Sequence, residues 1–439
     1  MTFQRHKRGI FGLAVLGLMA GCAPDSTAPN STTPAALTVP SYAKIPAPNR
    51  IVDDDHAQCP TAGFTTIQSA VAASSPGDVI KVCAGLYQES VNIPISLTLL
   101  GAQAGKDGSG RKNTADATRE SIIQPTSDAA ISVVADGVII DGFDVIEASG
   151  GNHAGIITSN AFSGYMIRNN IINETPYLGI GILFASTEGN PSIVERNYFD
   201  GHSDESGALS AVGVYQNGGD PGLHNATIRE NTFFHNGGNG DNGTGINLLG
   251  NDPSQISNVL VERNKSIDDG SFIAMFYAPG TIITNNEVKR PTGSGIFVAE
   301  GNDNVVISYN KISDGQYGGV RVNASDFGGP TNSNLNISHN DIHNMGLQSS
   351  DPGPWLSGIS AASSSMNNSL LSDNNSQNNG EDGIGIASGN SGNTINHNTM
   401  RGNAVFDAFD GSAGGGTAGT ANTWTNNNCK TSSPAGLCK

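Results

Sequence analysis

Charged and polar side chains recur at one position of a repeating sequence pattern, three or four residues after a recurring asparagine. The side chains at this position are Asn173, Asp200, His235, Asp268, Lys289, Asp314, His343, Asn378 and Arg401, with Asp269 and Arg290 beside them. Two carboxylates, such as Asp268 and Asp314, suit the acid and base of glycoside hydrolysis. Lys289 or Arg290 would instead suit removal of the proton next to a uronate carboxylate, as in β-elimination. The candidate catalytic residues are Asp268, Asp269, Lys289, Arg290, Asp314 and His343.

A second row of side chains is predicted to point outward from a strand about ten residues after each asparagine. Its members are Leu183, Tyr215, Asn247, Phe276, Phe297, Arg321, Ser360 and Ala387. Aromatic rings stack on sugars and charged groups orient acidic ones. The row therefore predicts polysaccharide binding by Tyr215, Phe276, Phe297 and Arg321, flanking a groove in the Asp268–Arg290–Asp314 region.

The sequence assigns neither a metal site nor a cofactor. Ca²⁺ takes oxygen ligands, so the carboxylates of the charged column would suit a calcium ion. The sequence alone does not decide whether calcium binds there. Asp53-Asp54-Asp55 is interpreted as a solvated stretch at the start of the folded domain rather than as a metal site. The column also has a purely structural interpretation, because turns are polar and alternating charges help neighbouring coils to stack.

The asparagine that sets this register recurs nine times. Each follows an apolar residue and two variable residues, as in Ile167-Arg168-Asn169-Asn170, and another apolar residue comes soon after it. The spacings run from 22 to 34 residues with a mean of 28.5, and the nine are Asn170, Asn197, Asn231, Asn264, Asn286, Asn310, Asn340, Asn374 and Asn398. Asn tolerates the left-handed backbone at turns, and amides stacked about 4.8 Å apart can bond to one another as a ladder. The pattern predicts a solenoid of stacked coils.

The second strand of each coil alternates in polarity, which predicts one inward apolar stack. This stack is Ile182, Val214, Ile246, Met275, Ile296, Val320, Ile359 and Ile386. The predicted fold class is all-β, a single-domain right-handed parallel β-helix with an N-terminal capping helix within 65–73. Right-handed crossovers between parallel strands are strongly preferred. We predict the cap and first coils over 51–137 and the repeats over 138–421.

The N-terminus is typical of a targeting segment. Arg5, Lys7 and Arg8 precede a short apolar run, and Leu18-Met19-Ala20-Gly21-Cys22 resembles a bacterial lipobox. The resemblance implies a lipoprotein signal peptide at 1–21 and a lipid on Cys22 that anchors the exported protein to a membrane of the cell envelope. Residues 22–50, rich in Ser, Thr and Pro, are predicted to be a disordered linker.

The other four cysteines form two local pairs, Cys59 with Cys83 and Cys429 with Cys438. In an exported protein these predict two disulfides that close the two ends of the solenoid. The second disulfide, with Trp424, would form a C-terminal cap over 422–439.

Acidic residues outnumber basic ones, and the formal net charge is −17. Such a charge argues against binding to nucleic acid or to anionic lipid head groups. We expect a monomer, whose membrane contact is made by the lipid anchor.

Three segments near the N-terminus resemble the corresponding part of pectin methylesterases: Phe64–Val71, Gly85–Ile93 and Leu97–Gly101. The resemblance implies a pectin-lyase-like fold, but the catalytic Gln-Asp and Asp-Phe-Ile-Phe-Gly segments of that family have no counterpart. The motif sets of polygalacturonases and alginate epimerases are missing as well. The coils also resemble a periplasmic copper-binding β-helix family, a similarity that concerns the repeat and therefore the fold.

The predicted function is that of an envelope-anchored lipoprotein that binds a polysaccharide along its solenoid face. Whether it also cleaves the polysaccharide, as a lyase or a glycoside hydrolase, stays open. The alternatives are a non-catalytic structural or adhesive scaffold and a periplasmic copper-binding protein.

Overall fold

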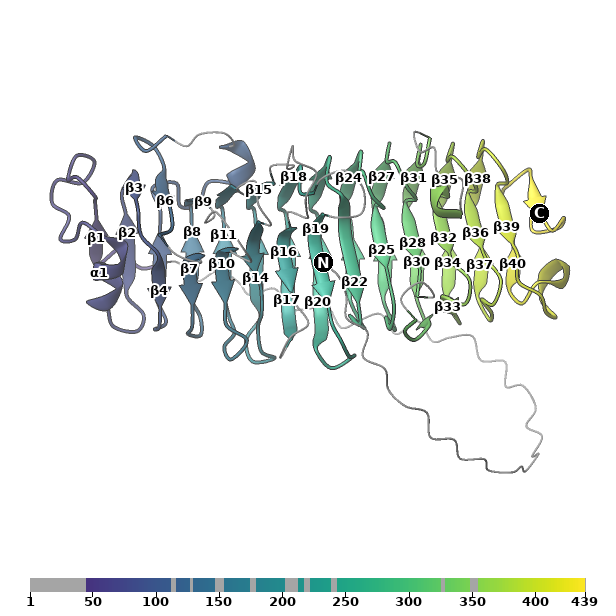
Figure 1. Cartoon of the computed structure of the whole chain (residues 1–439), viewed down its shortest axis with the longest axis horizontal. Helices are drawn as coiled ribbons and strands as arrows, with labels where there is room; N and C mark the ends of the chain where they lie inside the picture. The colour runs from purple at the N-terminus through teal and green to yellow at the C-terminus, as the bar shows by residue number, and fades with distance from the viewer. Residues whose placement is uncertain are drawn as a thin grey trace, which may run out of the picture. The chain divides into compact units, whose positions relative to one another are not determined.

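The chain winds into coils of three short strands, and each strand pairs in parallel with its counterpart in the next coil (Figure 1). The structure, a computed structural model, describes residues 45–111, 116–126, 129–146, 154–173, 179–201, 212–216, 222–237, 243–324, 328–347 and 354–438. These residues lie within one compact unit, Val39–Lys439. The architecture is a right-handed parallel β-helix, as the sequence predicts.

Sheet A, which contains the first strand of each coil, has 14 strands among the described residues. They are β1 Arg50–Val52, β2 Val79–Val82, β5 Thr98–Leu100, β8 Ile139–Asp141, β11 Met166–Arg168, β14 Ser192–Glu195, β17 Leu223–Arg229, β20 Ile256–Glu262, β23 Ile282–Thr284, β26 Val306–Ser308, β30 Asn336–Ser338, β34 Leu370–Ser372, β37 Thr394–Asn396 and β40 Thr423–Thr425.

Sheet B follows sheet A in each coil and has 12 strands in the described ranges. They are β3 Gly85–Tyr87, β6 Ser121–Ile123, β9 Asp144–Ile146, β12 Ile171–Asn173, β15 Tyr198–Asp200, β18 Thr232–Phe234, β21 Lys265–Ile267, β24 Glu287–Lys289, β27 Lys311–Ser313, β31 Asp341–His343, β35 Asn375–Gln377 and β38 Thr399–Arg401.

Sheet C completes the coil with 13 strands in the part of the chain that the structure describes. They are β4 Val91–Ile93, β7 Ala129–Val133, β10 Ala154–Thr158, β13 Ile180–Leu183, β16 Val212–Gln216, β19 Thr244–Leu249, β22 Ser271–Phe276, β25 Ile296–Val298, β28 Val320–Val322, β32 Ile359–Ala361, β36 Ile384–Ile386, β39 Ala408–Asp410 and β41 Ser432–Ser433. A small sheet pairs β29 Asn332–Ser333 with β33 Met366–Asn367. The helical segments are α1 Ile67–Ala72, η1 Gly108–Gly110, η2 Pro354–Leu356 and η3 Thr417–Gly419.

The core is a set of apolar stacks, because alternate side chains of every strand point inward. Most of the predicted stack in sheet C is correct, with Ile182, Val214 and Ile246 in register. Two members were assigned two residues too late. Ile273 and Ile384 occupy those places, while Met275 and Ile386 belong to the next inward row. The number of residues between the ladder asparagine and this row differs from coil to coil, so the asparagine does not fix the register of sheet C.

The predicted asparagine ladder runs through the turns between sheets A and B. The Asn197 carboxamide oxygen accepts bonds from the backbone N–H and the side-chain NH₂ of Asn170, at 2.9 and 3.0 Å. The Asn197 NH₂ group donates to the Ile167 carbonyl of the preceding coil and to Asn231. This scheme repeats through Asn398 and continues to Asn427, which the prediction missed.

One part of the ladder prediction is wrong. The left-handed backbone conformation belongs to the residue before each ladder asparagine, as in Arg196 (φ 52°), Glu230 (φ 55°) and Arg263 (φ 53°). Few of these residues are asparagines, although the conformation costs other residues roughly 1–2 kcal/mol. The ladder position therefore requires Asn because its carboxamide both accepts and donates hydrogen bonds along the stack. The backbone conformation of Asn is not the reason.

A short helix lies at the N-terminal end of the coils, where sheet A begins. Helix α1 starts after the N-cap Thr66, whose side chain accepts a bond from the Ser69 N–H, and the Glu89 carboxylate accepts bonds from the first two helical N–H groups. Its buried face, Ile67, Ala70 and Val71, joins the core. The predicted Cys59–Cys83 disulfide is present.

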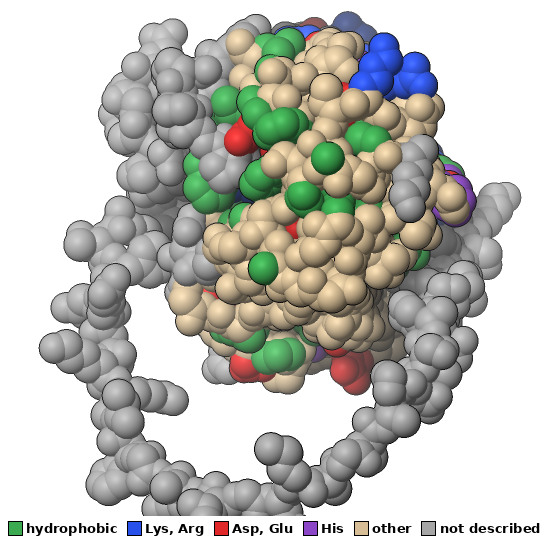
Figure 2. All heavy atoms as spheres, turned by 90° about the vertical axis from the view of Figure 1, so that its right-hand side faces the viewer, with side chains coloured by type: hydrophobic (Ala, Val, Ile, Leu, Met, Phe, Trp, Pro, Cys, Tyr) green, Lys and Arg blue, Asp and Glu red, His purple; other side chains and the backbone are tan. Residues whose placement is uncertain are grey.

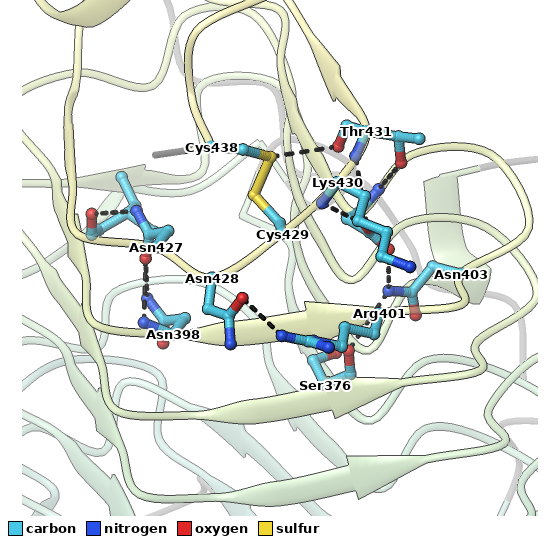
Figure 3. The surroundings of a disulfide bond; sticks show 12 residues. Ser376, Asn398, Arg401, Asn403, Asn427, Asn428, Cys429, Lys430, Thr431 and Cys438 are labelled. Carbon is cyan, nitrogen blue, oxygen red and sulfur yellow. Dashed lines mark hydrogen bonds between the residues drawn. A yellow bond between two sulfur atoms is a disulfide. The ribbon is translucent and has the colours of Figure 1, made fainter.

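The C-terminal end has a cap of its own, and Figure 2 shows that this end presents mostly polar side chains and backbone, with apolar side chains interspersed. Trp424 in β40 is 1% exposed and its indole N–H donates to Asp410 at 2.7 Å. The Cys429–Cys438 disulfide lies just beyond the last ladder bond, next to the Arg401–Asn428 hydrogen bond (Figure 3). A covered end prevents strand pairing with other chains.

Residues 1–44 lie outside the described residues, so the predicted signal peptide, lipidated Cys22 and most of the predicted linker do too. Among the described residues, none of the helices has the length and apolar character needed to cross a membrane.

Candidate functional site

The side chains predicted to form one charged column form two columns. Counting from the asparagine groups residues that end a strand of sheet B with residues that lie one position later. The last residues of the sheet B strands pair as Asp200, Phe234, Ile267, Lys289, Ser313 and His343. From Phe234 onward, the residue after the strand is left-handed and starts the turn to sheet C. We call the row His235, Asp268, Arg290, Asp314 and Asn344 the BC ridge. The six candidate catalytic residues therefore lie at different positions of the coil.

The charges of the BC ridge are paired with one another. The Arg290 guanidinium donates to both oxygens of Asp268, at 2.7 and 2.8 Å, and His235 lies 3.7 Å from the same carboxylate. The Asn344 NH₂ group donates to Asp314 at 3.0 Å, and this bond lowers the pKa of the Asp314 carboxyl. An ionised, hydrogen-bonded carboxylate makes a poor proton donor. This arrangement fits the structural interpretation, in which neighbouring coils are held together by alternating charges.

Asp269 points into the solenoid rather than toward solvent. It is fully buried, accepts bonds from the backbone and side chain of Asn236, and accepts another from Ser266. Burial raises the pKa of Asp269 to about 7. Asn379 and Asn403 form a similar pair further along the solenoid. Asp269 is thus a member of an interior amide row.

Lys289 and His343 end strands of sheet B and face outward from it. The Lys289 ammonium lies 2.5 Å from Glu287, and His343 stands in register with Ser313 and Gln377. The structure therefore brings Asp268, Arg290 and Asp314 together on the ridge, puts Lys289 and His343 in the neighbouring column on sheet B, and places Asp269 in the interior.

The predicted aromatic row on the outer face of sheet C is correct for most of its length. Tyr215, Asn247, Phe297 and Arg321 share the row, with Ala274 where Phe276 was placed and Gly385 where Ala387 was placed. Phe276 lies two residues further along its strand. It still contacts the row, because its ring is T-shaped to that of Phe297 at a centroid distance of 6.3 Å.

Arg321 lies between two aromatic rings. Its guanidinium carbon is 5.2 Å from the Phe297 ring centroid and 4.2 Å from that of Trp355, which the chain supplies from η2. Phe276, Phe297, Arg321 and Trp355 form what we call the sheet C cluster. All four are partly exposed. Cation–π contacts of this kind fix the side chains in place before any ligand arrives.

Tyr215 is three coils away from Phe297 in the same row. It is partly exposed, and burial raises the pKa of its phenol, which stays protonated and able to donate a hydrogen bond. The row thus offers a second aromatic contact at a distance from the cluster, as an extended ligand would require.

Two carboxyl groups that the sequence reasoning missed lie beyond the cluster on the next coils. Glu381 and Asp382, the carboxyl pair, precede β36, where an Asp-Gly-Ile segment is a visible but weak signal. Glu381 is partly exposed, and the Ser357 hydroxyl donates to its carboxylate at 3.4 Å. Ser357 lies two residues after Trp355 in the chain. Asp382 is 4% exposed, and burial, followed by the Glu381 charge, raises its pKa to about 7.

One cluster of carboxylates in the described residues has the spacing that a metal ion requires. Among the described residues, Asp53, Asp54 and Asp55 are the group whose ligand atoms lie within 4.8 Å of one another. Backbone N–H groups of Cys59, Leu86 and Ala57 donate to these three carboxylates. Each of the three carboxylates thus accepts a backbone hydrogen bond, while the second oxygen of Asp54 is buried without a partner among the described residues. The expected solvated stretch is wrong for Asp53, which is fully buried, and no carboxylate of the sheet C face belongs to this cluster.

The middle of the chain, residues 211–368, matches the family model described as right handed beta helix region. Among curated proteins, none matches the sequence. Three solved structures are similar over most of the chain. The DFA-IIIase from Arthrobacter chlorophenolicus A6, solved without its lid, is 15% identical at a TM-score of 0.46, with 86% of this chain and 94% of that chain covered.

The second is the catalytic unit of a thermostable α-1,3-glucanase from Streptomyces thermodiastaticus, 15% identical at a TM-score of 0.46, with 90% and 71% covered. The third is a mannuronic acid specific polysaccharide family 6 lyase from human gut microbiota, 14% identical at a TM-score of 0.47, with 82% and 80% covered. At these identities the likeness concerns the fold alone.

Proposed function

We propose that the protein binds a polysaccharide chain along the outer face of sheet C. The observation that carries this proposal is the cation–π contact of Arg321 with both Phe297 and Trp355, with the Phe276 ring T-shaped to that of Phe297. Partly exposed rings of this size are the side chains that sugar rings stack on, because their faces are apolar and their edges accommodate polar groups.

The geometry of the row suits a polymer rather than a single sugar. Successive coils are about 4.8 Å apart, so residues of one row face a linear ligand at regular intervals. The row extends from Tyr215 to the cluster and on to Ser360.

The test is binding to a panel of neutral and acidic polysaccharides, followed by calorimetry on the ligands that bind. We expect Trp355→Ala and Phe297→Ala to weaken binding about tenfold, which corresponds to about 1.4 kcal/mol. The control is Tyr309→Ala, which removes an exposed ring stacked on His339 at the turns between sheets A and B. Equal losses in all three variants, or no ligand in the whole panel, would remove the proposal.

The two alternative functions differ from this proposal in what they require. A purely structural or adhesive scaffold would show no specific glycan ligand. Copper binding would require clustered soft or imidazole ligands. Within the described residues, no group of three metal-ligand side chains contains a histidine. No observation on the described coils favours copper over a glycan.

We propose also that the protein is exported and held at the cell envelope by a lipid on Cys22. The lipobox-like sequence before Cys22 and the two disulfides support this, since disulfides persist in oxidising compartments. Cys22→Ser should abolish incorporation of a labelled fatty acid and release the protein from the membrane fraction. Unchanged labelling of that variant would refute the anchor.

A further inference from the structure

We infer that Glu381 and Asp382 are an acid–base pair that hydrolyses a glycosidic bond of the polysaccharide held by the sheet C cluster. This inference rests on the proposed function and adds a reaction to it. Glycoside hydrolysis needs one carboxylic acid and one carboxylate at the bound sugar, and the three observations below place such a pair on the same face as the cluster.

The first observation is the position of Asp382. Gly385 takes the place in the sheet C row that follows Arg321 and Ser360. A side chain on Gly385 would stand 3.1 Å from the Asp382 Oδ2 atom and 3.2 Å from the Ser357 hydroxyl. The glycine therefore leaves room for that oxygen beside the outer row of sheet C. The other oxygen of Asp382 accepts the Phe406 N–H, which fixes the direction of the carboxyl.

The second observation is the position of Glu381. Its carboxyl accepts bonds from the backbone N–H of Leu356 and from the Ser357 hydroxyl, so it is held by the segment that also carries Trp355. The Asp382 N–H donates to the same Ser357 hydroxyl at 3.3 Å. Ser357 thus ties both members of the pair to the residue that stacks on Arg321.

The third observation is that the two environments differ. Burial raises the pKa of Asp382 to about 7, and the neighbouring Glu381 charge contributes to this rise, so Asp382 keeps its proton near neutral pH. Burial also raises the pKa of Glu381, but the bonds from Leu356 and Ser357 to its carboxylate oppose that effect. Asp382 is therefore the acid and Glu381 the base.

The reaction needs water as its only other reactant. The Asp382 proton moves to the bridging oxygen as the bond between that oxygen and the anomeric carbon breaks. The oxygen of water bonds to the anomeric carbon, and the water proton passes to the Glu381 carboxylate. The carboxyls then return to their starting protonation states by exchange with solvent.

The experiment measures new reducing ends from the polysaccharide that binds best in the panel, with the full-length protein. We expect Asp382→Asn and Glu381→Gln each to lower kcat at least about 100-fold, with Kd for the polysaccharide within about threefold of wild type. The control is Asp373→Asn, an exposed carboxylate at the turns between sheets A and B, which should cleave normally. The amide oxygen of the Asp382→Asn variant can still accept the Phe406 N–H, so a merely structural Asp382 would leave kcat unchanged, and that result would overturn the inference.

The pH profile of the wild-type protein gives a second test that depends on no variant. Cleavage should fall above about pH 7, as Asp382 loses its proton, and should fall again in acid, as Glu381 gains one. A flat profile through pH 8 would overturn the assignment. Binding without cleavage removes the reaction and leaves the proposed function standing, whereas an absence of binding removes the proposed function itself.

Discussion

The turns between sheets A and B contain the same buried asparagine in successive coils. The residues at the turns between sheets B and C, and on the face that follows them, differ from coil to coil. In the first region every coil from Asn170 to Asn427 has the same buried amide with the same partners. In the second, the corresponding interior places hold Asn236, Asp269, Met345, Asn379 and Asn403. A position whose neighbours above and below are identical is constrained to one residue type, and a position without that constraint can vary and acquire a function.

The same contrast separates the two groups of exposed aromatic side chains. Tyr309 and His339 stack on each other at the turns between sheets A and B, 4.7 Å apart, in register with the ladder. Phe297, Arg321 and Trp355 instead combine two strands of sheet C with a residue brought in by a long connection. Irregular connections are where solenoids build specific sites, because a regular coil offers the same surface at every step.

The largest expected effect comes from interrupting the ladder with Asn310→Ala. The Asn310 oxygen accepts the backbone and side-chain N–H groups of Asn286, and its NH₂ group donates to Ile283 and Asn340. Removal leaves several buried polar groups without partners, at roughly 1–3 kcal/mol each. We expect a loss of roughly 3–5 kcal/mol in the free energy of unfolding, measured by urea denaturation.

The matched control for the ladder is Asn336→Ala. Asn336 points outward from β30 in sheet A, and the change should lie within about 0.5 kcal/mol of wild type. Similar losses for the two variants would show that stacking does not distinguish the ladder position, and the comparison of the two turn regions would then fail.

A smaller effect is expected where the interior row between sheets B and C contains a carboxyl in place of an amide. The pKa of Asp269 is raised by burial to about 7, from 3.8 in the unfolded chain. Between about pH 4 and 7 the unfolded chain loses this proton while the folded chain keeps it, so stability falls as the pH rises. Asn cannot ionise. Asp269→Asn should therefore be more stable than wild type at pH 8 by on the order of a few kcal/mol, with the difference shrinking toward about pH 4.5.

The control for the pH effect is Asp252→Asn, at an exposed carboxyl whose pKa is lowered by hydrogen bonds from Ser254. It is ionised in both states from about pH 4.5 to 8, so its substitution should add no pH dependence there. The measurement is the free energy of unfolding at both pH values. A difference between Asp269→Asn and wild type that does not change with pH would contradict the burial argument.

The contrast between the regions also explains what the sequence could predict. The coils, the ladder and both disulfides could be predicted from spacings along the chain. Stacking requires the same residue type at the same place of every coil, so the repeat is visible in the sequence. The outward rows were only partly predictable. A one-residue difference in spacing from the asparagine separates His235 and Asp268, which lie on the turn, from Lys289, which ends its strand. A two-residue difference separates Phe276 from the row that contains Ala274 and Phe297. Trp355 and the carboxyl pair lie on connections of irregular length, where no repeat fixes the register.

The smallest expected effect tests whether the BC ridge is structural. Arg290 is 54% exposed and its partner Asp268 26%, so solvent screens their ion pair. Arg290→Ala should cost at most about 1 kcal/mol in urea denaturation, less in high salt, and should leave polysaccharide binding and cleavage at wild-type levels. A large loss of cleavage with little loss of stability would instead place the chemistry on the ridge. It would revive the pairing of Asp268, Arg290 and Asp314 as the catalytic group, and the carboxyl pair beyond the sheet C cluster would lose its role.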